Sequence, residues 1–259
     1  MLVVQDIFKT FNPGTINEKR ALDGVSITLN EGDFVTVIGG NGAGKSTFLN
    51  AISGVWPIDY GKILVDNIDI TMMPEHKRAK YLGRVFQDPM MGTAADMEIE
   101  ENLALAKRRG KRRGLRMGIT SKERIHYKEI LKSLDLGLED RLTSKVGLLS
   151  GGQRQALTLL MATLKKPKLL LLDEHTAALD PKTAKKVLET TEKIVKKDNI
   201  TTLMITHNMK DAIAHGNRLI MMNKGKIIFD ISGEAKMQLT VEDLLKKFAE
   251  ASGQELAND

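Results

Sequence analysis

The spacing of hydrophobic and polar positions changes in stages along the chain. From residue 2 to about 38, short β-rich runs (LVVQDIF, VSITL and DFVTVIG) are separated by turn signals, which predicts hairpins that end in a buried strand. After residue 44 the spacing becomes helical, and residues 89–165 stay mostly helical and polar, with EIEENLALAKR and ERIHYKEILKSLDL as amphipathic segments. Farther on, the apolar runs KLLLLD and TTLMITH flank the helical stretch PKTAKKVLETTEKIVKK. Strand, helix and strand in this order predict a parallel α/β core.

This pattern predicts one domain that carries an inserted helical lobe. A chain of 259 residues, 42% of them hydrophobic, is long enough to bury a full core. The expected parts are a β subdomain with the first part of the core (1–88), a helical subdomain (89–165), the rest of the α/β core (166–230) and a helical tail (231–259). In the tail, TVEDLLKKFAEA predicts a capped amphipathic helix that begins near Thr240 and packs on the core.

The segment GGNGAGKST, residues 39–47, has the spacing G-x-x-x-x-G-K-[ST] of a phosphate-binding loop. It follows the apolar strand FVTVI and precedes a helix, so backbone N–H groups and the helix N-terminus can face phosphate oxygens. A dinucleotide fingerprint is not expected, because it would need a third glycine where Lys45 stands. We expect Lys45 to reach the β- and γ-phosphates and Ser46 to bind Mg²⁺. The residues predicted to contact nucleotide here are Gly39, Gly40, Asn41, Gly42, Ala43, Gly44, Lys45, Ser46 and Thr47.

Polar residues at the ends of other strands supply candidates for hydrolysis. Asp173 and Glu174 end the run LLLLDE, where Asp173 is expected to hold Mg²⁺ and Glu174 to orient or deprotonate a water molecule. His207 ends the strand in MITHN and is placed to donate to a γ-phosphate, although a single histidine is more often structural. Gln87 in VFQDP is by itself compatible with a simple surface position.

A second glycine turn, LSGGQRQ at 149–155, is also able to approach an anion. Together, the order of Lys45, Gln87, LSGGQ, LLLLDE, AALD and His207 resembles the ATP-binding cassette (ABC) ATPase family from about residue 2 to 230. The resemblance implies a P-loop NTPase (RecA-like) α/β core with an N-terminal antiparallel β subdomain and an inserted α-helical subdomain. It also implies an enzyme that hydrolyses ATP and uses Mg²⁺.

The same resemblance implies a dimer of two copies arranged head to tail. Ser150, Gly151, Gly152 and Gln153 of one copy would then bind the ATP held by the other, and Asp180 in AALD would cross the interface. Closure of such a dimer would follow ATP binding, and opening would follow hydrolysis.

By that resemblance, further roles follow for individual residues. Phe11 would stack on adenine, with a core position as the alternative. Gln87 would contact Mg²⁺ and the attacking water, Glu174 would be the base, and His207 would contact the γ-phosphate. Ser46, Gln87 and Asp173 form the expected metal set.

The sequence departs from the family pattern at His175, which stands where Pro is usual. It is either a neutral replacement or an additional titrating group beside the base.

Charge and composition narrow the possible partners. The net charge of +6 comes from KRRGKRRGLR at 107–116, which holds seven basic residues, while the rest of the chain is close to neutral. This basic stretch is either a solvated loop or a contact for a membrane surface or an acidic partner; nucleic acid is not expected, because no aromatic residue is interleaved to stack bases. The absence of cysteine fits a reducing cytosol, and no run is long and apolar enough for a membrane-spanning helix.

The resemblance to the family implies the ATPase subunit of a bacterial ABC transporter, of importer type. It would lie in the cytoplasm at the inner face of the membrane and work with a separate permease and an extracytoplasmic solute-binding protein. Uptake of a small solute, such as an amino acid, is the expected function. The alternative is a soluble ABC ATPase that drives an assembly process such as iron-sulfur cluster biogenesis.

Overall fold

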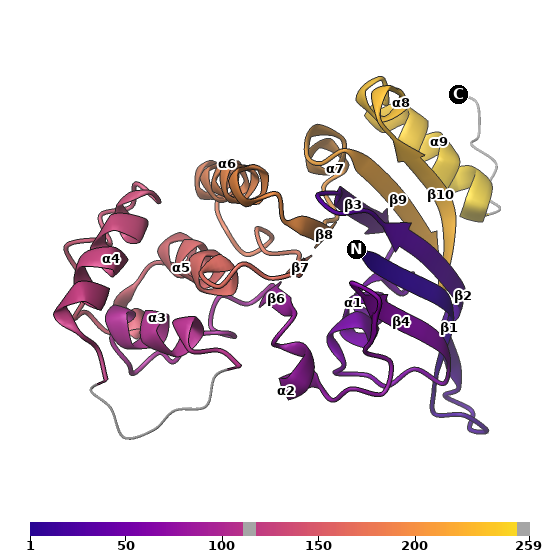
Figure 1. Ribbon diagram of the computed structural model, residues 1–259. Helices are drawn as coiled ribbons and strands as arrows, with labels where there is room; N and C mark the ends of the chain where they lie inside the picture. The colour runs from indigo at the N-terminus through magenta and orange to yellow at the C-terminus, as the bar shows by residue number, and fades with distance from the viewer. Residues whose placement is uncertain (111–117, 253–259) are drawn as a thin grey trace.

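The computed structural model describes residues 1–110 and 118–252 (Figure 1). Its strands are β1 (Leu2–Phe11), β2 (Lys19–Leu29), β3 (Phe34–Gly39), β4 (Tyr60–Val65), β5 (Ile68–Asp69), β6 (Leu82–Val85), β7 (Leu169–Asp173), β8 (Thr201–Ile205), β9 (Arg218–Asn223) and β10 (Lys226–Ser232). Its α-helices are α1 (Lys45–Ser53), α2 (Glu75–Arg78), α3 (Ile99–Lys107), α4 (Ser121–Lys132), α5 (Gly151–Thr163), α6 (Pro181–Asp198), α7 (Met209–Ala214), α8 (Glu234–Met237) and α9 (Val241–Ser252). A 3₁₀ turn, η1 (Val146–Leu148), precedes α5.

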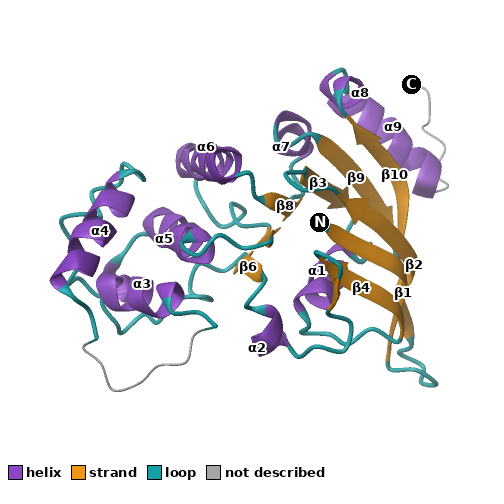
Figure 2. Ribbon diagram, viewed as in Figure 1, coloured by secondary structure: helices purple, strands orange, loops and turns teal. Residues whose placement is uncertain are grey.

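In the described residues the strands form two sheets (Figure 2). The smaller sheet is antiparallel, in the order β2-β1-β4-β5. The larger sheet has the order β10-β9-β3-β8-β7-β6, in which β9, β3, β8, β7 and β6 run parallel and β10 is antiparallel to β9. The predicted N-terminal hairpins and the parallel core are therefore confirmed.

Helix α1 lies between the two sheets. Its buried side chains Phe48, Leu49 and Ile52 pack in one cluster with residues of the small sheet and with Leu171 and Leu203 of the large sheet. Because side chains of a strand alternate in direction, neighbouring leucines of β7 face the opposite side, where they pack with α5 and α6. This double burial explains why β7 and β8 read as continuous apolar runs.

The end of α1 is held by a buried arginine. Arg78 donates to Ala51 O and Ile52 O, both at 2.8 Å, and so satisfies carbonyls that the last turn of a helix leaves without partners. The same guanidinium donates to Met73 O at 2.6 Å and to Thr71 O at 2.8 Å. Arg78 thus joins α1 to the segment that leads into α2.

Helices α3, α4 and α5 share a separate hydrophobic cluster at the left of Figure 1, away from the small sheet. The predicted amphipathic segments correspond to α3 and α4. The tail helix α9 is also confirmed: Thr240 and Asp243 exchange capping hydrogen bonds, and Leu244 is buried against the large sheet. The subdomain boundaries at 88, 165 and 230 stay predictions.

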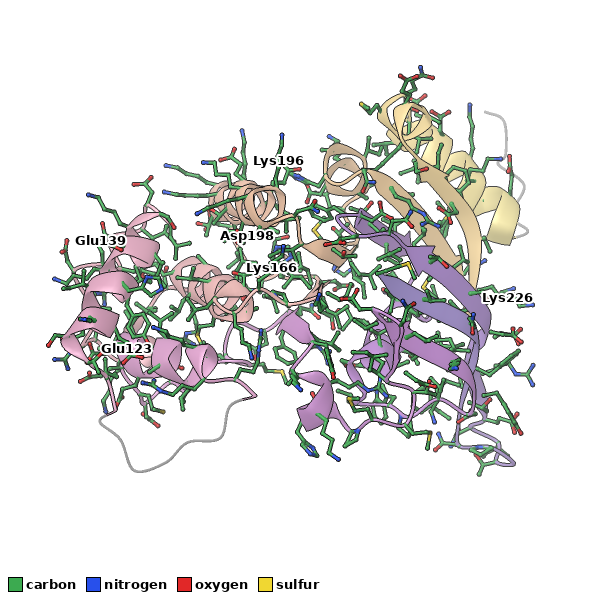
Figure 3. All side chains as sticks on the ribbon, in the orientation of Figure 1. Glu123, Glu139, Lys166, Lys196, Asp198 and Lys226 are labelled. Atoms are coloured by element: carbon green, nitrogen blue, oxygen red, sulfur yellow. The ribbon has the colours of Figure 1, made fainter. Side chains whose placement is uncertain are left out.

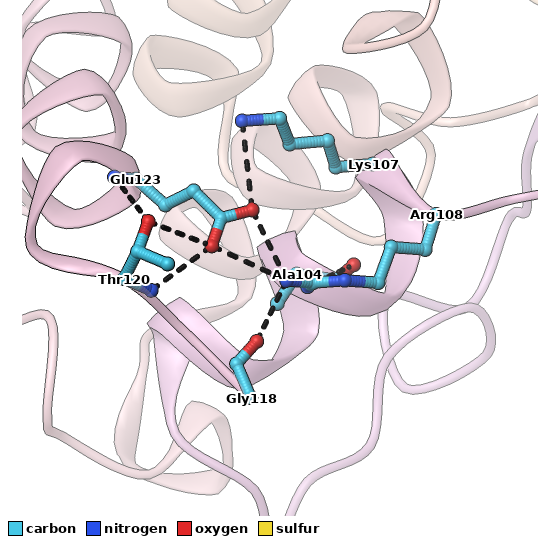
Figure 4. Close-up of polar contacts among 6 residues, drawn as sticks. All are labelled: Ala104, Lys107, Arg108, Gly118, Thr120 and Glu123. Atoms are coloured by element: carbon cyan, nitrogen blue, oxygen red, sulfur yellow. Dashed lines mark hydrogen bonds and ion pairs between the residues drawn. The ribbon is translucent and has the colours of Figure 1, made fainter. Parts of the chain in front are cut away.

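The first basic residues of 107–116 are used inside the helical lobe. Arg108 Nη2 lies 3.0 and 3.2 Å from the two carboxylate oxygens of Glu123, and Lys107 Nζ lies 3.7 Å from the same group (Figure 4). Arg109 donates to Ala162 O and Lys165 O. These three side chains therefore contribute to packing, and residues 111–116 lie outside the described part of the chain.

The open edges of the two sheets are joined at the side of the molecule where Figure 3 labels Lys226. Lys226 Nζ lies 3.1 Å from Asp23 Oδ2, and Asp23 N donates to Gly225 O at 3.0 Å. Both contacts connect the β9–β10 turn to β2, whose neighbour β1 ends at Phe11. The strand that carries Phe11 is thus fixed relative to the core sheet.

Candidate nucleotide-binding and hydrolysis site

The glycine loop leaves β3 and enters α1 through a left-handed residue. Gly44, at φ 104°, is the N-cap of α1, and a side chain there would place its Cβ 2.5 Å from Ala21 O. Only glycine combines this backbone conformation with so close an approach. The N-terminus of α1 therefore faces the loop, an arrangement in which helix N–H groups can bind an anion.

A cavity of about 500 Å³ lies over this loop. Besides the glycine loop, it contains an aromatic ring, an amide, a carboxylate and an imidazole, and these four groups come from four different segments of the chain. Its lining residues are Phe11, Lys19, Ala21, Asn41, Gly42, Ala43, Gly44, Lys45, Ser46, Thr47, Gln87, Glu174 and His207.

Lys45 is the buried cation of this cavity. Its Nζ donates to Gly39 O at 2.8 Å and to Gly40 O at 3.1 Å, so the ammonium closes the loop on itself. Burial lowers the pKa of Lys45, while the carboxylates of Glu174 and Asp173 act to raise it. A phosphate entering the loop would offer the ammonium charged acceptors in place of neutral carbonyls. Hydrogen bonds to charged acceptors are the stronger ones.

Glu174 and His207 form a pair above the loop. Glu174 Oε2 lies 2.8 Å from His207 Nε2, and Glu174 is 9% exposed. Glu174 takes up a left-handed conformation, φ 46°, and its N–H donates to Ile205 O at 3.0 Å. Since β7 and β8 are parallel neighbours, their carboxyl ends meet, and this register brings the two side chains together. The arrangement places a carboxylate and an imidazole where a water molecule could be activated.

Asp173 faces an arginine that the sequence motifs did not indicate. Arg84 Nη2 lies 3.4 Å from Asp173 Oδ2 and donates to Asn50 Oδ1 at 2.7 Å, while its guanidinium covers the ring of Phe86. Burial raises the pKa of Asp173, and Arg84 opposes that shift. Asp173 lines a second cavity of about 700 Å³ together with Gln87, which borders both cavities.

The second glycine turn caps helix α5. Ser150 Oγ accepts from Gln153 N at 3.3 Å, and Gln153 Oε1 accepts from Ser150 N at 3.2 Å, which completes a capping box. Gly152 lies against Thr183 of α6 so closely that a Cβ would overlap it. Ser150 and Gly151 are exposed, and none of the four residues from 150 to 153 lines the cavity over the P-loop.

The chain thus brings some of the predicted site residues together and leaves others apart. Lys45, Ser46, Gln87, Glu174 and His207 share one cavity with Phe11. The glycine turn of α5 lies outside this cavity. So does exposed Asp180, whose carboxylate caps α6 by accepting from Thr183 N at 3.1 Å. The exposed turn and the exposed cap are available to a second molecule.

His175 is buried directly behind Glu174. It is 2% exposed, and its Nε2 lies 3.2 Å from Thr191 Oγ1. The hydroxyl hydrogen of Thr191 is donated to Val187 O, so the imidazole must supply the proton of the first bond. Burial, assisted by nearby His215, lowers the pKa of His175 to about 4. The ring is therefore a neutral Nε2–H donor that ties the turn after β7 to α6.

The loop, the buried lysine and the carboxylate-imidazole pair define a P-loop nucleotide-binding protein built for phosphate chemistry. The ABC transporter family model matches residues 22–177. A tyrosine transport ATP-binding protein of Clostridioides difficile is 47% identical over 249 residues, 96% of this chain and 98% of the relative. The spermidine/putrescine import ATP-binding protein PotA of Haemophilus influenzae is 33% identical over 230 residues, 89% of this chain but 57% of that longer relative.

Solved structures that resemble this chain indicate the same family as these relatives. A dimeric ATP-binding cassette in a post-hydrolysis state bound to ADP and Pi has a TM-score of 0.77 and 29% identity, over 93% of this chain and 100% of that chain. The ADP conformation of another cassette has a TM-score of 0.78 and 30% identity, over 98% of this chain and 99% of that chain. The chain therefore belongs to the ABC transporter family, as an ATP-binding subunit, and it is an ATPase. The predicted fold class is confirmed with it.

Residues 1–110 and 118–252 contain no helix that is both long and apolar enough to cross a membrane.

The buried state of His175 predicts an acid-labile fold. Its pKa is about 4 in the folded chain and about 6.5 when exposed, so the unfolded chain binds the extra proton between these values. Stability should therefore fall as pH drops from about 6.5 toward 4, by up to roughly 3 kcal/mol. The variant His175→Gln keeps an N–H donor but does not titrate. Urea unfolding from pH 7 to 4.5 should show a smaller loss of unfolding free energy in this variant than in the parent chain.

The matched control is His126→Gln, which removes an exposed histidine of α4. It should retain the full acid dependence of the parent chain. An equally steep acid dependence in His175→Gln would contradict the assignment of this component to His175.

Proposed function

We propose that this chain binds Mg-ATP in the cavity over the P-loop and hydrolyses it within a dimer, to energise solute uptake through a separate permease. The observation that carries the proposal is that Lys45, Glu174 and His207 share one cavity, while the exposed turn at Ser150 lies outside it. A single chain therefore holds one part of the site and displays another part to a neighbour.

Nucleotide binding would begin with the loop amides and Lys45. The β- and γ-phosphates would replace Gly39 O and Gly40 O as acceptors for the ammonium, and the base would lie beside Phe11. Ser46, Gln87 and Asp173 offer the hydroxyl, amide and carboxylate oxygens that suit Mg²⁺. The described residues form no cluster of three or more acidic, histidine or cysteine side chains able to hold a metal, which fits an ion that arrives with the phosphates. When bound, Mg²⁺ would neutralise charge on the phosphate oxygens.

Hydrolysis would use the pair above the loop. Glu174 would accept a proton from the attacking water as the water oxygen bonds to the γ-phosphorus. The bond between the γ-phosphorus and the β–γ bridging oxygen would break to leave ADP. His207 would leave Glu174 and donate to a γ-phosphate oxygen. Lys45 would stabilise the charge that develops on the transferred group.

The second copy would complete the site. Ser150, Gly151, Gly152 and Gln153 of that copy would contact the γ-phosphate, and the N-terminus of α5 would add its positive end. Asp180 would lie in the same interface. This arrangement couples ATP binding to closure of the dimer.

We infer that the transported substrate is an amino acid. The relative that covers nearly the whole chain at 47% identity is named for tyrosine transport, and PotA is named for import. These names favour transport over an assembly function. The full complex would contain integral membrane permease subunits and an extracytoplasmic solute-binding protein, with this chain peripheral on the cytoplasmic face.

Replacing Glu174 by Gln tests the hydrolytic mechanism. The amide cannot accept the proton from water, so ATP turnover should fall by at least about a hundredfold while ATP binding persists. Sedimentation velocity with Mg-ATP should then show a stable dimer that is absent without nucleotide. Glu129→Gln, at an exposed position of α4, is the control and should turn over ATP as the parent does. Full turnover by Glu174→Gln would remove Glu174 from the role of base.

Purification from native membranes tests the transport role. The tagged chain, extracted in mild detergent, should be recovered with a multi-span permease identified by mass spectrometry. Transported amino acid added with its binding protein should raise the ATPase rate of this complex. Recovery of soluble partners alone would instead support an assembly function.

A further inference from the structure

Trp56, the only tryptophan of the sequence, contacts Phe11. The two ring centroids are 5.3 Å apart and the planes meet at 86°, an edge-to-face geometry that aromatic pairs prefer. Trp56 lies just after α1 and is 41% exposed, so burial in the core does not account for its position. Phe11 lines the cavity over the P-loop, and Trp56 does not.

The segment that carries Trp56 is fixed at both ends. Trp56 N donates to Asn50 O in the last turn of α1, at 3.3 Å. Three residues later, the carboxylate of Asp59 accepts from Thr10 N at 2.5 Å and from Lys9 Nζ at 2.9 Å. The loop therefore connects the C-terminal end of α1 to the last residues of β1, where Phe11 lies.

Phe11 is bounded by two groups outside the cavity. Trp56 meets its ring edge to face, and Lys9 Nζ lies 5.7 Å from the ring centroid, held there by Asp59. The residues after Phe11 form an exposed turn that offers no comparable support. Without Trp56, the ring would gain freedom that base binding would have to remove, and ordering a side chain weakens binding.

We propose that Trp56 is a positioning residue for recognition of the adenine base. Its edge-to-face contact holds the ring of Phe11 in the orientation that stacks on a planar base, and it does so without touching the nucleotide. This inference rests on the proposed contact between Phe11 and the base. It assigns to the loop after α1 a role in base binding that is distinct from the role of the P-loop in phosphate binding.

Comparing two ligands distinguishes binding of the base from binding of the phosphates. ATP and inorganic tripolyphosphate should both bind the P-loop, but only ATP presents a base. Calorimetry on Trp56→Ala should show ATP binding weakened by about two- to tenfold, the range expected for loss of one aromatic pair, with tripolyphosphate binding unchanged. Trp56→Phe, which keeps an aromatic edge, should restore much of the ATP affinity. Tyr60→Ala removes a 75% exposed aromatic residue of β4 and should leave both ligands unaffected.

A double variant tests whether Trp56 acts through Phe11. Phe11→Leu should weaken ATP binding by about tenfold, as expected for loss of one stacked base, and adding Trp56→Ala to it should cause no further loss. Unchanged ATP affinity in Trp56→Ala, or an equal loss for tripolyphosphate, would overturn the positioning role. Additive losses in the double variant would overturn it as well. If Phe11→Leu itself binds ATP normally, the contact between Phe11 and the base is wrong and the inference falls with it.

Discussion

Burial of α1 between two sheets is the constraint on which the rest of the structure depends. A short helix that begins with a left-handed glycine has little stability of its own, and most helical stability in proteins comes from packing. Here Phe48, Leu49 and Ile52 are held by apolar side chains from both sheets, and Arg78 satisfies carbonyls at the far end. The N-terminus of α1 is consequently fixed at the edge where β3, β7 and β8 end, so the glycine loop, Glu174 and His207 lie around one cavity.

The polar groups at this edge are satisfied by one another. Lys45 is bonded to carbonyls of its own loop, Glu174 to His207, and Asp173 to Arg84. Each buried charge therefore has a partner, as the low polarity of such a site requires. In the proposed mechanism, Lys45 and His207 would exchange their internal contacts for contacts with phosphate, while Glu174 would face the attacking water and Asp173 would face Mg²⁺. His175, a neutral donor to Thr191, adds no further charge behind Glu174.

Local patterns in the sequence were enough to predict the loop at 39–47, the apolar strands that end at Asp173 and Ile205, and the helices α3, α4 and α9. Each of these depends on the spacing of nearby residues. The pairing of Arg84 with Asp173 and the contact of Trp56 with Phe11 could not be predicted this way, because each joins segments that are far apart in the sequence. The location of Ser150 outside the P-loop cavity has the same cause, since it follows from the orientation of the helical lobe. The resemblance to a family supplied an interpretation of that turn, which no property of the residues alone provides.

In the proposed dimer, each ATP lies between the P-loop of one chain and the glycine turn of another. Since the chain has no cysteine, Asn41→Cys and Ser150→Cys can be placed separately in two differently tagged copies, both carrying Glu174→Gln. A short bifunctional thiol reagent should link one tagged copy to the other in Mg-ATP and should not link them without nucleotide. Failure to link the two copies in Mg-ATP, or linkage that is equally strong without it, would contradict this head-to-tail dimer.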